Sequence, residues 1–451
     1  MTTRRKFLQS AAVVAGFPTI VPSSVFGANS PSNRVNVGAI GVGRISRGHD
    51  LPGIWQHDIS RIMAVCDLDS NRVELGKTLI NGYYAKTTGK PYAGVTGYHR
   101  YQDLLANKDI DAVVISTPDH QHAICAAAAV RAGKDVYLQK PASLTIAEGR
   151  YLSDVVQKSG RIFQIGSQQR SLSPWKQFHR TCELVRNGRI GELKHVEIGL
   201  PGDPSGPEAP EMPVPKNLDY DAWLGSTPME YYTEIRVHPQ NDFGRPGWLR
   251  CEQFGAGMIT GWGAHHVDTA HWGMDTEHTG PVEIWGTAEF PKSGLWNVHG
   301  SFKTEARYAN GVTMAISGDY PNGIKFIGSE GSIFVTRDDT VTDSDPVSKE
   351  KLPPLIASNP KILTSVIGPN EIHLYESPEH HLNWLQSVKS RKPTIAPVET
   401  AHRACSTCLL HHIAMKTKRR LQWDPAKERF INDDAANAML SRPQRAPYKL
   451  V

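Results

Sequence analysis

The apolar residues of 35–166 fall into short runs separated by longer amphipathic segments. The continuous apolar runs, which predict buried strands, stand at 35–40, 62–66, 112–117, 135–140 and 161–166. Segments with helical patterning lie between them, at 44–57, 71–83, 101–107 and 118–133. Another helix is expected after Thr145, which has the capping-box spacing to Glu148. Strands that alternate with helices predict a parallel, doubly wound sheet whose ligand binds at the carboxyl ends of the strands.

Beyond residue 166 the pattern becomes that of an α+β domain. A helix is predicted at 175–187, and strands at 193–200, 281–290, 304–318, 324–328 and 331–336. An irregular insertion rich in Pro, Gly and Trp separates the first two strands, and the polar residues 338–375 are expected to form an arm or a lid. Helices at 379–390 and 400–419 precede a coil-rich tail.

The chain is therefore expected to have an α/β fold with two domains. The first, at 33–165, is doubly wound. The second, at 166–451, is an α+β domain with a large, open, mostly antiparallel sheet, whose C-terminal helices could pack back on the first domain. An open sheet of this kind favours a homo-oligomer, a dimer or a tetramer.

Composition is that of a soluble globular protein, with 39% hydrophobic and 21% charged residues in 451. The net charge of +5 gives no case for a nucleic-acid partner, because three of the basic residues lie within the first six positions. The sequence contains no run of about 18 to 20 apolar residues, so no membrane span is predicted.

The N-terminal residues 1–28 have the pattern of an export signal. Arg4 and Arg5 form a twin-arginine motif, a weakly apolar stretch follows, and small residues close the segment at Gly27 and Ala28. A basic disordered N-terminus is the alternative. The twin-arginine route carries folded proteins, so a periplasmic or otherwise exported location is compatible with a tightly bound cofactor loaded before export.

A glycine turn follows the first strand and indicates a dinucleotide site. Gly41 permits a tight turn and Gly43 lets backbone N–H groups approach a pyrophosphate, with Arg44 and Ile45 next in the same turn. Asp67 ends the second strand, where its carboxylate can accept hydrogen bonds from the ribose hydroxyls. This acid favours NAD, although NADP stays possible because arginines lie nearby at positions 61 and 72. A tight turn that binds nothing is the alternative.

Six cysteines are scattered along the chain without the spacing of a disulfide framework. Cys405 and Cys408 have the spacing of a redox motif, but their segment has helical patterning. Buried helical thiols are therefore expected in preference to a metal or redox site.

Four segments occur in the order found in one enzyme family. They are GAIGVGRIS at 38–46, STPDHQHA at 116–123, QKPAS at 139–143 and GMITGWGAHHVDTAHW at 257–272. With them the chain resembles the Gfo/Idh/MocA family, which includes glucose–fructose oxidoreductase and inositol dehydrogenase. The resemblance implies an NAD(P)-binding Rossmann domain and an oxidoreductase acting on CH–OH groups.

The resemblance also implies roles for residues at two strand ends of the first domain. Thr117, Pro118 and His122 would line the cofactor site, with Asp119 in place of a family asparagine and available as a helix N-cap. Lys140 would contact cofactor and substrate and act in catalysis. A lysine beside a cationic ring should have a lowered pKa, and Gln139, where the family has glutamate, removes a negative partner.

His265 is the second expected catalytic residue, as the base that takes the alcohol proton. The family has an aspartate four residues earlier, where this chain has Gly261, so another group such as Asp268 or Thr260 would have to fix the imidazole tautomer. No metal is predicted, although the histidines at 265, 266 and 271 could bind a divalent ion.

The substrate is expected to contact residues of the second domain. Arg170 matches a family position that lines the substrate cleft, and Trp248, His266 and Asp268 are assigned to the substrate with it. Composition alone suggests further side chains that could stack on a sugar or bind its hydroxyls, and these are Trp175, Tyr232, Arg236, His238 and Arg245.

The function expected from these patterns is an exported NAD-dependent oxidoreductase that acts on a sugar or glycoside with a tightly bound cofactor. One alternative is an NAD-dependent glycosidase or lyase that oxidises its substrate transiently and reduces it again. A second is a sugar- or nucleotide-binding sensor without catalysis, suggested by Gly261 and Gln139.

Overall fold

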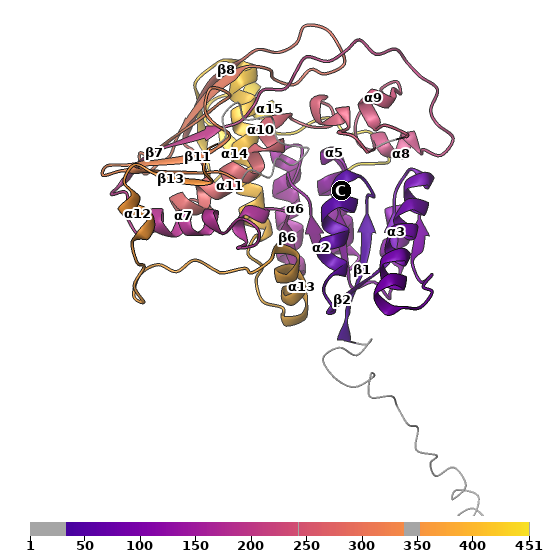
Figure 1. Cartoon of the computed structure of the whole chain (residues 1–451). Coiled ribbons are helices and arrows are strands. Elements are labelled where there is room, and N and C mark those ends of the chain that lie inside the picture. The colour runs from indigo at the N-terminus through magenta and orange to yellow at the C-terminus, as the bar shows by residue number, and fades with distance from the viewer. Residues whose placement is uncertain (1–32, 242, 338–351, 451) are drawn as a thin grey trace, which may run out of the picture.

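The computed structural model describes residues 33–241, 243–337 and 352–450 (Figure 1). The expected export signal at 1–28 and part of the expected arm, at 338–351, lie outside the described residues. Within those ranges, no helix combines the length and the apolar character that crossing a bilayer requires.

The first domain is the predicted doubly wound domain. Its six strands are all parallel, in the order β3-β2-β1-β4-β5-β6. The strands are β1 (Val35–Ile40), β2 (Ser60–Cys66), β3 (Thr96–Tyr98), β4 (Ala112–Ile115), β5 (Asp135–Leu138) and β6 (Phe163–Ile165). The edge strand β3 was not predicted, because its three residues are half-exposed or exposed and have no apolar run.

Helices on both faces of this sheet follow the predicted order. They are η3 (Ser46–Asp50), a π-helical turn, α2 (Leu51–Trp55), α3 (Ser70–Thr88), α4 (Tyr101–Ala106), α5 (Asp119–Arg131) and α6 (Ile146–Ser159). The capping box is confirmed: Thr145 Oγ1 accepts from Glu148 N at 3.2 Å, and the Glu148 carboxylate accepts from Thr145 N at 3.1 Å.

The second domain contains a nine-stranded, mostly antiparallel sheet in the order β13-β12-β11-β7-β10-β9-β8-β14-β15. Its strands are β7 (Leu193–Gly199), β8 (Glu283–Ala288), β9 (Phe302–Arg307), β10 (Thr313–Ser317), β11 (Gly323–Gly328), β12 (Ser332–Val335), β13 (Leu355–Ala357), β14 (Leu421–Asp424) and β15 (Arg429–Phe430). Only β7 and β10 pair in parallel.

One strand prediction in this domain is wrong. The single strand expected at 304–318 is an antiparallel pair, β9 and β10, joined by a turn in which Gly311 has φ of +85°. The coil-rich tail also carries β14 and β15, which extend the sheet, and α15 (Asp434–Ala438).

Helices of the second half connect the two domains. α7 (Lys176–Arg186), α11 (Gly263–Met274) and α14 (Val398–Thr417) pack together beside the large sheet (Figure 1). α14 also packs on α6, and α13 (His380–Ser390) packs on α2 and β1. Cys405 and Cys408 are buried free thiols of α14, as expected.

The insertion between β7 and β8 covers the carboxyl edge of the first sheet. Its short helices are α8 (Tyr220–Leu224), α9 (Glu234–Val237), η5 (Gly247–Arg250) and α10 (Met258–Gly261). α8 and α9 lie over the end of α5 in Figure 1, and His120 of α5 bonds through Nε2 to the carbonyl of Trp223 at 2.7 Å.

Candidate functional site

The glycine turn after β1 has the geometry that the sequence predicts. Gly41 has φ of +88°, and a Cβ at this position would lie 2.7 Å from the carbonyl oxygen of Ser116. Asp67 stabilises the turn, since one carboxylate oxygen accepts from Val42 N at 2.8 Å and the other from Asp69 N at 3.0 Å. The residues after β1 and β2 are thus held together at the edge of the sheet.

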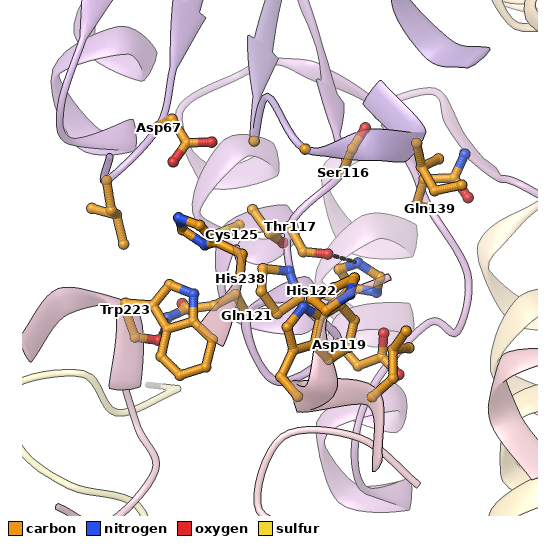
Figure 2. Close-up of a pocket in the computed structure, with 18 of the residues that line it drawn as sticks. Asp67, Ser116, Thr117, Asp119, Gln121, His122, Cys125, Gln139, Trp223 and His238 are labelled. Carbon is orange, nitrogen blue, oxygen red and sulfur yellow. Dashed lines mark hydrogen bonds between the residues drawn. The ribbon is translucent and has the colours of Figure 1, made fainter. Parts of the chain in front are cut away.

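One pocket collects the residues expected to bind the cofactor (Figure 2). They are Gly41, Gly43, Arg44, Ile45, Asp67, Thr117, Pro118, His122 and Lys140. Trp248, assigned to the substrate, lines the same pocket, as do Trp223 and His238 of the insertion. A Cβ at Gly43 would meet only the Arg72 guanidinium, at 3.6 Å, so the turn leaves open space in front of it. This cradle fits a dinucleotide whose phosphates lie against the turn and whose ribose lies at Asp67.

Lys140 follows β5 and lines the same pocket as Asp67. Its ammonium donates to the carbonyl oxygen of Gly261 at 2.6 Å, which ties the first domain to α10. Burial lowers the pKa of Lys140 to about 8, against the opposing effect of the Asp119 carboxylate. The lowered pKa agrees with the expectation for a lysine that relays a proton near neutrality.

Asp119 and His122 lie on the first turn of α5. His122 contacts two carbonyl oxygens, that of Pro141 through Nδ1 at 2.6 Å and that of Thr117 through Nε2 at 2.9 Å. Burial lowers its pKa to about 4, and a neutral imidazole carries one N–H, so only one of these contacts is a donated hydrogen bond. The sequence predicted Asp119 as the helix N-cap. This prediction is wrong, because Pro118 holds that position.

His265 lies one helical turn beyond Gly261, in α11, but it is not among the residues that line the pocket. Burial, with Arg337 and Lys140 nearby, holds its pKa well below the ordinary value, and its Nδ1 atom is buried without a hydrogen-bond partner. Neither group expected to fix its tautomer does so: Thr260 Oγ1 donates to the carbonyl of Gly257, and Asp268 binds an arginine.

The other histidines of α11 have separate partners. His266 bonds through Nε2 to Asn322 Oδ1 at 2.9 Å, and His271 through Nε2 to the Tyr308 hydroxyl at 2.8 Å. Their nitrogens do not converge with His265 on one ion. In the described part of the chain, the group that could hold a metal is His49, Asp50 and His381.

Hydrogen bonds account for the close approach of these three side chains. Oδ1 of Asp50 lies 3.1 Å from both His49 Nδ1 and His381 Nε2, while Oδ2 accepts from Ser116 Oγ at 2.6 Å. The second ring nitrogen of His381 lies 3.2 Å from a Glu379 carboxylate oxygen. A His381 imidazolium can donate to both carboxylates, one from each ring nitrogen.

Arg170 and Asp268, both assigned to the substrate, bind each other. Arg170 Nε lies 2.6 Å from Asp268 Oδ2, Nη2 lies 2.9 Å from Oδ1, and a third nitrogen lies 2.7 Å from Glu277. The Arg170 and Asp268 side chains are 2% and 1% exposed and do not line the pocket. Their charges are thus paired inside the protein.

An aromatic and arginine cluster at the glycine turn was not predicted. Arg47 lies 3.0 Å from the ring centroid of Phe243, and Arg72 lies 5.1 Å from the same centroid. Burial and repulsion from Arg72 lower the pKa of Arg47 to about 10. The sequence signal was the pair of arginines, 44 and 47, one turn apart after the glycines. Phe243 comes from a segment about 200 residues away and carries no local signal.

The insertion is also anchored beside Asp67. His238 bonds through Nε2 to Asp69 Oδ2 at 3.0 Å, and Asn217 donates to Asp69 Oδ1 at 2.7 Å. Deeper in the pocket, Asp203 accepts from Met258 N at 2.7 Å and lies 3.4 Å from Arg250 Nε. Of the side chains suggested by composition, His238 and Arg245 line the pocket.

The fold and this pocket define a two-domain NAD-binding oxidoreductase. Family models agree: residues 35–167 match "Oxidoreductase family, NAD-binding Rossmann fold", and residues 205–450 match "Oxidoreductase family, C-terminal alpha/beta domain". The second match covers more than half of the chain, and the protein belongs to the Gfo/Idh/MocA family of oxidoreductases.

Curated relatives match part of the chain. A "Glycosyl hydrolase family 109 protein" of Shewanella pealeana is 32% identical over 193 residues, 42% of this chain and 40% of the relative. An inositol 2-dehydrogenase of Salmonella typhimurium is 24% identical over 216 residues, 45% of this chain and 57% of the relative. The chain thus spans about two to three fifths of the length of these relatives.

Solved structures share the fold at low identity. The aldose-aldose oxidoreductase of Caulobacter crescentus superposes with a TM-score of 0.56 at 16% identity, covering 86% of this chain and 99% of that one. The WlbA dehydrogenase of Bordetella pertussis, in complex with NADH and UDP-GlcNAcA, gives a TM-score of 0.59 at 14% identity, covering 87% and 99%.

Proposed function

We propose that this protein is an NAD-dependent oxidoreductase that oxidises a CH–OH group of a sugar or glycoside. The observation that carries the proposal is Lys140, which donates to the Gly261 carbonyl at 2.6 Å and lines the pocket formed by the glycine turn, where burial lowers its pKa to about 8. Sugar-acting relatives in both comparisons support the substrate class.

The chain's residues hold the cofactor and manage one proton. Gly41 and Gly43 give the phosphates access to backbone N–H groups, and Asp67 binds the ribose hydroxyls. Bound NAD⁺ supplies the acceptor for the hydride of the substrate's carbinol carbon. Lys140, as the neutral amine, takes the hydroxyl proton, and Trp248 offers a face against which a sugar ring can stack.

Native mass spectrometry of the purified protein, followed by a panel of sugars and methyl glycosides, tests this function. Retained NAD and reduction of that NAD by a panel member, seen as absorbance of the reduced nicotinamide, are the expected results. Protein that neither carries nor binds NAD would overturn the proposal.

A second candidate is a redox-neutral glycosidase, favoured by the family 109 relatives. Oxidation of a ring hydroxyl, loss of the aglycone, addition of water and reduction would then form a closed cycle on one bound cofactor. Release of nitrophenol from a p-nitrophenyl glycoside without added cofactor supports this candidate. A ketosugar formed only with an external electron acceptor supports the first.

We also propose export through the twin-arginine motif. Free NAD is scarce outside the cytoplasm, so an exported enzyme has to keep its cofactor, in accord with the covering insertion. Cell fractionation of the protein and of an Arg4→Lys/Arg5→Lys variant tests this: the variant should remain in the cytoplasm, and equal distribution of both proteins would contradict it.

Homo-oligomer formation is proposed from the large sheet. Residues of β9 alternate between buried and exposed, so one face of this strand is open to a second copy. Light scattering coupled to size-exclusion chromatography should give the mass of a dimer or tetramer, and a monomer mass would contradict the proposal.

A further inference from the structure

Four consecutive polar side chains open α5, and three of them are tied to main-chain carbonyls. His120 and Gln121 bind the Trp223 carbonyl of α8, at 2.7 and 3.0 Å. His122 contacts the carbonyls of Thr117 and Pro141. The fourth, Asp119, has its own backbone N–H as hydrogen-bond partner. In the parts of the chain that the structure describes, Asp119 forms no ion pair with a Lys, Arg or His nitrogen within 4.0 Å.

These ties hold Asp119 in the pocket beside Lys140. His122 contacts the carbonyls of Thr117 and Pro141, and so joins the segment just before Asp119 to the segment that contains Lys140. Both line the pocket, and Asp119 is only 3% exposed. Figure 2 shows Asp119 on the side of the pocket away from Asp67, with Thr117 and His122 between them. A buried carboxyl that lines the pocket and forms no ion pair with the described residues lies where it can contact a ligand.

We infer that Asp119 is an additional acid–base residue of this enzyme, acting with Lys140 on the hydroxyl proton of the substrate. The inference rests on the proposed oxidoreductase function and deepens it.

The step balances as a two-electron oxidation. The carbinol C–H bond breaks and its electron pair leaves with the hydrogen to NAD⁺, which is reduced. The O–H bond breaks, its electron pair forms the carbonyl π bond, and the proton goes to the Lys140 amine. The resulting ammonium is stabilised by the charge of the Asp119 carboxylate. Because no lysine nitrogen of the described residues lies within 4.0 Å of this carboxylate, the proton passes to it through one water and from there to solvent.

The charges around the pair fit this role. Burial raises the pKa of Asp119 to about 7, and Lys140 opposes that rise. The pKa of Lys140 is about 8, because Asp119 counteracts burial and three arginines, 337, 245 and 44. Each group therefore affects the ionisation of the other, and an ionised Asp119 favours the ammonium form of Lys140.

Competitive labelling with acetic anhydride tests the pair without a substrate. Reactivity of the Lys140 amine, measured by peptide mass spectrometry from pH 6 to 10, gives its apparent pKa in the intact protein. In Asp119→Asn this pKa should fall by about one unit, a tenfold change in the ratio of amine to ammonium. Asp154→Asn, which removes a half-exposed carboxylate of α6 that lies 3.4 Å from Arg150, is the matched control and should leave it unchanged.

An unchanged Lys140 midpoint in Asp119→Asn would overturn the inference. Asp119→Ser serves as a second variant if the amide destabilises the fold, with near-native circular dichroism required of whichever variant is labelled. Loss of the proposed function alone, with no turnover in the sugar panel, leaves the labelling result intact, so the two failures are distinguishable.

Turnover then separates an acid–base role from a structural one. With a panel sugar as substrate, the acidic limb of the kcat profile should move to lower pH in Asp119→Asn, because more Lys140 is neutral there, while the maximal kcat falls at least tenfold. A fall in kcat without any displacement of the limb would assign Asp119 a structural role and contradict the inference.

Discussion

Gln139 donates a hydrogen bond from Nε2 to Oδ1 of Asp50 at 2.7 Å, joining the end of β5 to the π-helical turn after the glycine loop. Asp50 is fully buried, and hydrogen bonds with His381 and His49 hold the pKa of its carboxyl well below the ordinary value. An ionised carboxylate can only accept, so its neighbour at 139 must be a donor. Gln139, which stands where the family has glutamate, therefore supplies the donor that the carboxylate of Asp50 requires.

Gln139→Glu should destabilise the protein. It would place two carboxylates within hydrogen-bond distance in the interior, where like charge and desolvation cost about 1–3 kcal/mol. Urea unfolding at pH 7 measures the change. The double variant Asp50→Asn/Gln139→Glu removes the like charge but also the carboxylate that His381 contacts, so it should recover only part of the loss. A single variant as stable as the native protein would show that the two side chains do not interact.

The stability of the α13 contact should depend on pH through His381. Asp50 and Glu379 raise the pKa of this buried imidazole from 6.5 to about 9. Its contribution is therefore complete below pH 6.5, where the unfolded chain is protonated too, and is lost as the pH rises through 9. The pKa values of both carboxyls are lowered, so their contribution is present above about pH 4 and lost as the pH falls below it.

The free energy of unfolding, measured in urea at pH 6 and at pH 9.5, checks this sign. His381→Gln should cost about 1.5–3 kcal/mol at pH 6, the range for hydrogen bonds to charged groups, and much less at pH 9.5. His373→Gln, at an exposed position, is the control and should be neutral at both values. An equal cost of His381→Gln at the two pH values would contradict a charged His381.

Arg170 and Asp268 should act on stability and not on substrate affinity. Removing one partner leaves a buried charge, which costs about 3–5 kcal/mol. Asp268→Asn and Arg170→Met should each show this loss in urea unfolding, while Arg170→Met/Asp268→Leu should lose less than the two single variants summed. A raised KM in either single variant, with native stability, would instead return these residues to the substrate site.

Much of the first domain could be predicted because its signals are local. The strand, the glycine turn and Asp67 lie within 33 consecutive residues, and the capping box of α6 within four. The error at 304–318 was also local: Asn310 and Gly311 form a hairpin-turn dipeptide between two apolar runs, a signal that the continuous interpretation overlooked.

The composition of the site could be predicted only in part, because its remaining contacts join residues far apart in the chain. Arg170 and Asp268 are 98 residues apart, so their pairing left no mark in either segment. The same holds for Gln139 and Asp50, separated by 89 residues. The resemblance to the family assigned Arg170 to the substrate cleft, whereas the structure pairs it with Asp268 in the interior.

The glycine turn offers a test that separates folding from cofactor binding. Gly41→Ala should reduce stability by at least about 1–2 kcal/mol, since φ is +88° and the new Cβ would lie 2.7 Å from the Ser116 carbonyl oxygen. Gly43→Ala should keep native stability, because its Cβ would meet only the Arg72 guanidinium at 3.6 Å.

In Gly43→Ala the added methyl group would instead occupy the space in front of the turn, where we propose that the pyrophosphate binds. NAD retained per chain, measured by native mass spectrometry, should fall, and the Kd measured by calorimetry after removal of the cofactor should rise at least tenfold. Gly48→Ala, whose Cβ would have nothing within 4 Å, is the matched control for both measurements. Unaltered NAD binding in a stable Gly43→Ala variant would show that the phosphates do not lie against this turn. It would then also contradict the proposed orientation of the cofactor toward Lys140.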